Sequence, residues 1–137
     1  MPSKPTADAE PAPVLSEHEV LCRTSAVESG ALIDEMVRLL AARHPAVDPS
    51  AALRAVLDRE AEAPTFIAPG VAMPHARLEG IEETLVAAAT SEKGVRFPGS
   101  PDPIRLVVLV LAPASAPAAY LRVAAGVARR LQEHVPM

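Results

Sequence analysis

Apolar residues recur at helical spacing in two stretches of the N-terminal half of the chain. The first predicts a helix over residues 25–43, opened by a capping box in which Ser25 and Glu28 satisfy free amide donors. The second begins at Asp48-Pro49, a cap residue followed by proline at the first helical position, and ends before Pro64. The stripes expected to be buried are Leu32, Ile33, Met36, Val37, Leu39 and Leu40 in the first helix, and Leu53, Val56 and Leu57 in the second.

Strand patterns dominate the rest of the chain. Residues 84–90 alternate in the manner of a strand, and residues 104–111 are almost continuously apolar, which predicts a central strand buried on both faces with Arg105 reaching solvent. Weaker extended segments are expected at 14–22 and 65–67, and turns over 94–103. Pro117 opens a third helix, with an apolar side expected at Leu121, Ala124, Ala125, Ala128 and Leu131.

This order of elements predicts an α/β or α+β sandwich built around a small β-sheet. The chain has 137 residues, enough for one domain with a single core. Half of its residues are hydrophobic but only 2% are aromatic, so the core must be aliphatic. Residues 1–13 are rich in proline, alanine and charge without periodicity, and we expect a disordered leader there, ahead of a domain over residues 14–137.

Charge and cysteine content exclude several classes of protein. A formal net charge of −4 argues against a nucleic-acid partner, which usually requires a clustered basic face. The single cysteine, Cys22, cannot form a disulfide framework and fits a reducing cytoplasm. No segment has the length of a membrane span or the apolar core of a signal peptide, so we expect a cytoplasmic chain without direct membrane insertion. The spacing of His, Cys and carboxylates does not resemble a zinc site, and we expect neither metal nor cofactor.

The most informative motif is the run from Gly70 to Arg77, Gly-Val-Ala-Met-Pro-His-Ala-Arg. Gly70 allows backbone angles that a side chain forbids, and Pro74 pushes Met73 toward an extended conformation. We therefore expect an extended segment that ends and presents His75 at its tip. A histidine can accept and release a group near neutral pH, although a lone histidine is more often structural.

Four features taken in order resemble a known family. They are a helix ending in Arg59-Glu60, a lead-in over residues 65–70, the block ending at His75, and an apolar strand over 106–113 followed by a helix. Together they resemble the enzyme IIA domains of the fructose/mannitol class in the bacterial phosphoenolpyruvate-dependent phosphotransferase system, including the nitrogen-regulatory relatives. The resemblance covers roughly residues 14–131 and implies a mixed sheet flanked by helices, with a shallow, exposed histidine site.

The resemblance also implies roles for individual residues. His75 stands where the family's histidine receives a phosphoryl group from the phosphocarrier HPr and passes it to a IIB domain. Arg59 matches an arginine beside that site, and Arg77 follows the histidine where basic residues are frequent; guanidinium groups suit phosphate. Transfer to His75 requires one unprotonated ring nitrogen, while a hydrogen bond, for which a backbone carbonyl suffices, fixes the other.

Tyr120 departs from the family pattern. The family usually has a second histidine at this position, which helps to hold the phosphoryl group or the ring tautomer. A tyrosine hydroxyl can donate a hydrogen bond but cannot carry a positive charge. The chain also ends at Met137, where family members usually continue, so a shortened C-terminus is one interpretation.

Two functions stay open at this point. One is a phosphocarrier that uses His75; the other is a regulatory binding module with weak or lost phosphoryl transfer, suggested by Tyr120. A small-molecule enzyme with a histidine base fits less well, because no second acid or base, nucleophile elbow or glycine-rich phosphate loop accompanies His75.

Overall fold

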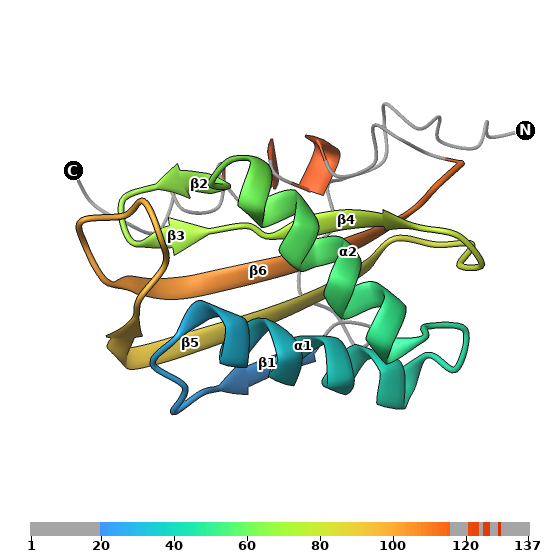
Figure 1. Ribbon diagram of the computed structural model, residues 1–137, viewed down its shortest axis with the longest axis horizontal. Helices are drawn as coiled ribbons and strands as arrows, with labels where there is room; N and C mark the ends of the chain where they lie inside the picture. Colours follow the sequence, from blue (N-terminus) through green and yellow to red (C-terminus); the bar gives the residue numbers. More distant parts are fainter. Residues whose placement is uncertain (1–19, 116–120, 124, 127–128, 130–137) are drawn as a thin grey trace, which may run out of the picture.

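The computed structural model describes residues 20–115, 121–123, 125–126 and 129 (Figure 1). Within the described residues, six strands form one mixed sheet and two helices of the N-terminal half pack on it, so the predicted α/β architecture is confirmed. In chain order the elements are β1 (Val20–Arg23), α1 (Ser29–Arg43), α2 (Pro49–Glu62), β2 (Phe66–Ala68), β3 (Val71–Ala72), β4 (His75–Leu78), β5 (Leu85–Val95) and β6 (Ile104–Pro113).

The sheet has the strand order β1-β5-β6-β3-β2, and β4 also pairs with β6. β1 runs parallel to β5, β5 antiparallel to β6, β6 parallel to β3 and β4, and β3 antiparallel to β2. Strands β3 and β4 continue one another along β6, because Val71 pairs with Leu106 and His75 with Val110 in the same register. Pro74 interrupts them, since it has no N–H to donate to the ladder.

Both faces of the central strand β6 are buried, as the apolar run predicts. Alternate side chains point to opposite faces of a strand. Val107, Leu109 and Leu111 belong to a large cluster with α1 and α2, which cover one face of the sheet (Figure 1). Val108 and Val110 belong to a smaller cluster on the other face. Arg105 is exposed, also as predicted.

The predicted capping box at the start of α1 is wrong. The helix begins at Ser29, and the Glu28 side chain makes no capping hydrogen bond. Residues 27–29 instead run extended beside Arg96, whose N–H donates to Val27 O at 2.8 Å and whose carbonyl accepts from Ser29 N–H at 3.1 Å. The Glu28 carboxylate accepts from the Arg96 guanidinium at 2.5 Å. These long-range contacts outweigh the local capping pattern.

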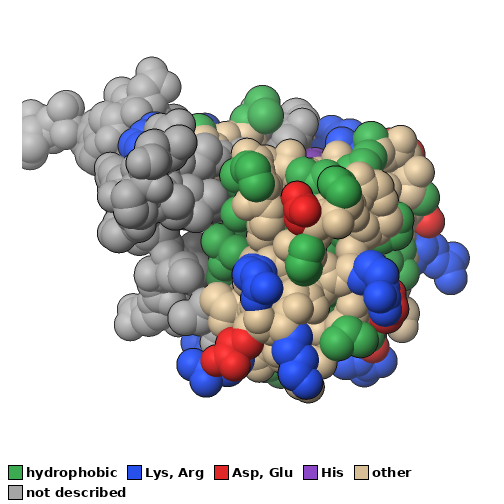
Figure 2. Space-filling model, turned by 90° about the vertical axis from the view of Figure 1, so that its left-hand side faces the viewer, with side chains coloured by type: hydrophobic (Ala, Val, Ile, Leu, Met, Phe, Trp, Pro, Cys, Tyr) green, Lys and Arg blue, Asp and Glu red, His purple; other side chains and the backbone are tan. Residues whose placement is uncertain are grey.

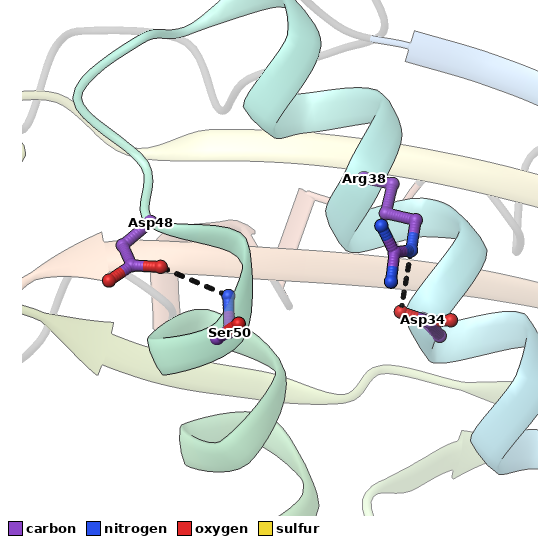
Figure 3. Close-up of polar contacts among 4 residues, drawn as sticks. All are labelled: Asp34, Arg38, Asp48 and Ser50. Carbon is purple, nitrogen blue, oxygen red and sulfur yellow. Dashed lines mark hydrogen bonds and ion pairs between the residues drawn. The ribbon is translucent and has the colours of Figure 1, made fainter.

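Helix α2 begins where the sequence predicts. The Asp48 carboxylate accepts a hydrogen bond from Ser50 N–H at 3.1 Å, which caps the helix, and Pro49 is the first helical residue (Figure 3). In α1, Arg38 donates to Asp34 at 3.0 Å, one turn away on the exposed side of the helix (Figure 3).

Some of the positions predicted to be buried are exposed in the structure. Leu57 is 38% exposed, because α2 is buried chiefly through Ala52 and Val56 and Leu57 lies outside that narrow contact. The described positions 121–123, 125–126 and 129 are helical, but Leu121 is 56% exposed while Val123, on the opposite side, is buried. Val123 packs in the smaller cluster, whereas Ala125 is exposed.

Strand β5 extends beyond its predicted end at residue 90 to Val95, through an irregular register between Thr90 and Val95. The expected first strand is described only over β1. Residues 14–19, the leader at 1–13, and Ala124, Ala128 and Leu131 of the expected third helix lie outside the described residues.

Two glycine-to-alanine variants should change the free energy of unfolding in opposite directions. Gly94 has a φ of 93°, and an added Cβ would lie well inside 3.0 Å of the Pro103 ring. Gly94→Ala should therefore destabilise the domain by about 1–3 kcal/mol. Gly30→Ala, at an exposed position near the start of α1 with nothing within 4 Å, should stabilise it by about 0.5 kcal/mol. Urea unfolding checks both; equal effects would contradict the geometry at Gly94.

Hydrogen bonding to Arg96 lowers the pKa of Glu28 in the folded protein. Because the folded pKa lies below the unfolded one, this ion pair stabilises the fold above the unfolded pKa, and its contribution is lost as the pH falls through the folded pKa. Glu28→Gln should therefore reduce stability at neutral pH and have no effect at acidic pH, with a smaller reduction in high salt. In an Arg96→Gln background, Glu28→Gln should change neither the stability nor its pH dependence; an unchanged pH dependence in the single variant would refute this.

Candidate functional site

His75 opens strand β4 and does not end a strand in an exposed turn. Its backbone pairs with Val110 in β6, and Val110 N–H donates to the preceding Pro74 carbonyl at 3.0 Å. The side chain is 8% exposed, so the expected exposed tip is wrong. The register along β6 places His75 on the face of Met73 and Val110, opposite the face that α1 and α2 cover.

A backbone carbonyl holds one nitrogen of the His75 ring. Nδ1 lies 3.1 Å from the carbonyl oxygen of Met73. A carbonyl oxygen only accepts hydrogen bonds, so Nδ1 carries the proton in this contact and the neutral ring has its lone pair on Nε2. This is the kind of contact that a histidine nucleophile requires at its second nitrogen.

The β2–β3 hairpin brings Met73 into position. The hairpin turns at Pro69-Gly70, where the φ of 78° at Gly70 matches the third residue of a type II turn. The Gly70 carbonyl accepts from Arg105 N–H at 2.8 Å and Leu106 N–H at 3.1 Å, which attaches the turn to β6. Beyond the other end of the hairpin, Met73 N–H donates to the Thr65 carbonyl at 2.8 Å.

Thr65 connects this hairpin to helix α2. Its hydroxyl donates to the carboxylate of Glu60, in the last turn of the helix. Hydrogen bonds therefore run from Glu60 through Thr65 and Met73 to the His75 ring. Thr65, Met73 and His75 are all buried. Sequence motifs indicated His75 and the Arg59-Glu60 pair but not Thr65, whose only signal was its place at the start of the lead-in.

The structure does not bring the predicted supporting arginines into hydrogen bonds with His75. Arg59 lies in the last turn of α2 and donates to the Ala63 carbonyl at 3.5 Å. Arg77 is exposed in β4, two residues beyond His75 and on the same face of the sheet by alternation. Within the described part of the chain, no hydrogen bond joins either arginine to the His75 ring. Tyr120 lies outside the described residues, and the roles of all three stay predictions.

Other features of the described residues limit the chemistry. No cluster of three His, Cys, Asp or Glu side chains that could hold a metal ion occurs among them. None of the described helices is long and apolar enough to cross a membrane. On the face of the molecule shown in Figure 2, Lys and Arg side chains lie scattered among acidic and hydrophobic ones and form no continuous basic surface.

Solved enzyme IIA structures share this fold. The nitrogen regulatory protein IIA-Ntr from Neisseria meningitidis superposes with a TM-score of 0.72 at 24% identity, over 85% of this chain and 80% of that one. The mannitol enzyme IIA from Escherichia coli, in its complex with phosphorylated enzyme IIB, superposes with a TM-score of 0.65 at 24% identity, over 87% and 81% of the two chains. The fold is thus that of the enzyme IIA domains, with a mixed sheet flanked by helices.

The chain belongs to the EIIA 2 family of the phosphoenolpyruvate-dependent sugar phosphotransferase system, whose model matches residues 13–135. This confirms the family that the motif around His75 indicated. The fructose-specific EIIA component of Haloferax volcanii is 35% identical over 85 residues, which make up 61% of this chain and 55% of that protein. The chain therefore spans about half the length of this curated relative.

Proposed function

We propose that this domain is a phosphocarrier in which Nε2 of His75 accepts a phosphoryl group from an HPr-like donor and passes it to a IIB domain. The observation that carries the proposal is the hydrogen bond from Nδ1 to the Met73 carbonyl. It holds the proton on one ring nitrogen and leaves the electron pair for nucleophilic attack on the other.

The electrons and protons of the proposed transfer are all accounted for without a further acid, base or metal. As the bond between Nε2 and phosphorus forms, the bond from phosphorus to the donor breaks, and the donor atom keeps the bonding electron pair. The His75 proton stays on Nδ1 while the ring gains positive charge. The Met73 carbonyl dipole, 3.1 Å away, stabilises that charge where it develops. Transfer to the IIB domain repeats the step in the opposite sense.

Supporting groups complete the proposed site. Arg59 and Arg77 supply positive charge for the phosphoryl oxygens, in the geometry that guanidinium groups favour. Tyr120 donates a hydrogen bond through its hydroxyl, in the place of the family's second histidine. The burial of His75 limits access of water to the phosphorylated ring and so slows its hydrolysis.

The partner proposal rests on the family and on one solved relative. That relative, the mannitol enzyme IIA, has been solved together with a phosphorylated enzyme IIB, and its fold matches this chain. An HPr-like donor and a cytoplasmic location follow from the same proposal, since the chain of transfers begins with phosphoenolpyruvate. Tyr120 favours a second candidate, a regulatory module that binds its target with weak or lost transfer.

Intact-mass measurement after incubation with phosphoenolpyruvate, enzyme I and HPr tests the proposal. The wild-type chain should gain one phosphoryl group, and His75→Ala should gain none, because Nε2 of His75 is the acceptor. His44→Gln, at the C-terminal cap of α1, is the matched histidine control and should be phosphorylated like the wild type.

A folded wild-type chain that gains no mass beside a working control carrier would overturn the phosphocarrier proposal. The regulatory module would then be the better function. Partner capture that persists in His75→Ala would support that second candidate.

A further inference from the structure

A series of hydrogen bonds connects helix α2 to the His75 ring through Thr65 and Met73. We propose that Glu60 and Thr65 are positioning residues that act through the Met73 carbonyl to keep the His75 ring in its Nδ1–H tautomer. This inference rests on the proposed function, because the tautomer matters for transfer only if Nε2 of His75 is the nucleophile.

The peptide bond between Met73 and Pro74 supplies the carbonyl that contacts the His75 ring. Proline has no N–H, so the Met73 carbonyl is the only hydrogen-bonding group of that peptide. Met73 directs its N–H to Thr65 and its carbonyl to the His75 ring. Both bonds lie outside the β6 ladder, which holds Ala72 and Pro74 on either side, so Thr65 is the contact that fixes the Met73 N–H itself.

The β2–β3 hairpin is weak on its own. Strand β2 has three residues, strand β3 has two, and the pairing between them is irregular. Hairpins of this size have little stability in isolation. The turn is attached to β6 through the Gly70 carbonyl, and the open end of the hairpin is attached to α2 through the Thr65 hydroxyl. Thr65 thus adds an attachment to α2, besides the pairing of β3 with β6, at the end from which His75 follows.

Glu60 lies at an electrostatically unfavourable position in its helix. A carboxylate in the last turn of a helix faces the negative end of the helix dipole, which is unfavourable. The hydrogen bond from Thr65 compensates for that position. Thr65 is 8% exposed, so water competes poorly for its hydroxyl, and loss of the carboxylate would leave a buried donor without this partner.

The fold contains a matched control for this arrangement. The hydroxyl of Thr24 donates to the Glu35 carboxylate in α1 at 2.8 Å, and Thr24 is 7% exposed. The two threonines thus make the same kind of bond to a helix glutamate with similar burial. Thr24 lies beside β5, where its N–H donates to the Thr90 carbonyl, and no bond in the described structure links it to Met73 or His75.

Ring-nitrogen NMR spectra of the unphosphorylated protein test the inference. In the wild type the proton of the neutral His75 ring should be on Nδ1. Thr65→Val and Glu60→Ala should give a mixture of the two tautomers and transfer phosphoryl about tenfold more slowly, the scale of one hydrogen bond to a charged group. Thr24→Val should keep the wild-type tautomer and rate.

A conservative variant of Glu60 and a folding control complete the test. Glu60→Gln keeps an acceptor oxygen and should retain the tautomer that Glu60→Ala loses. Thermal unfolding shows whether each variant folds; if Thr65→Val does not, the two Glu60 variants decide. A wild-type tautomer and rate in folded Thr65→Val or Glu60→Ala would overturn the proposal. The tautomer is measured without a phosphoryl donor, so a wild type that shows Nδ1–H but accepts no phosphoryl group refutes the proposed function alone.

Discussion

The parallel pairing of one chain segment with strand β6, kept in a single register across a proline, is the constraint on which the site depends. Val71 and His75 pair with Leu106 and Val110, although Pro74 between them lacks an N–H to donate. The pairing places His75 on a defined face of the sheet. The interruption gives Met73 a carbonyl that bonds to the ring of His75 and not to a neighbouring strand. Order in the ladder and a local break in it thus combine to produce one oriented histidine.

The rest of the fold fixes this segment from several directions. Strand β6 is buried on both faces, by two clusters that consist mainly of aliphatic side chains, and lies in the middle of the sheet. The Gly70 carbonyl binds two successive N–H groups at the start of β6, and Thr65 connects the same hairpin to the end of α2. Helix α2 itself rests on the sheet through the small side chains Ala52 and Val56, with its start set by the Asp48 cap. The orientation of His75 therefore depends on strand β6, the β2–β3 hairpin and helix α2.

Local chemistry made part of this structure predictable. The Asp48-Pro49 cap, the buried run of β6 and the unusual backbone angles at Gly70 are each specified by a few adjacent residues, and the structure has all three. The capping box at Ser25 failed because Arg96, far along the chain, pairs with residues 27–29. The burial of His75 was missed for a similar reason, since its strand continues only because β6 lies beside it. Thr65 could not be singled out, because its two partners, Glu60 in α2 and Met73 beyond the hairpin, come together only in the folded protein.

The setting of His75 within the sheet has a consequence for the order of events in the proposed transfer. A histidine on a free loop could swing from one bound protein toward another. A histidine whose peptide groups belong to the β6 ladder cannot travel in this way without breaking that ladder. In the proposed function, the phosphoryl donor and the IIB domain would therefore bind the same small surface in turn, and the presence of one would exclude the other. Such a domain would work by alternation of partners, with the phosphorylated protein as a separate species that diffuses between two encounters.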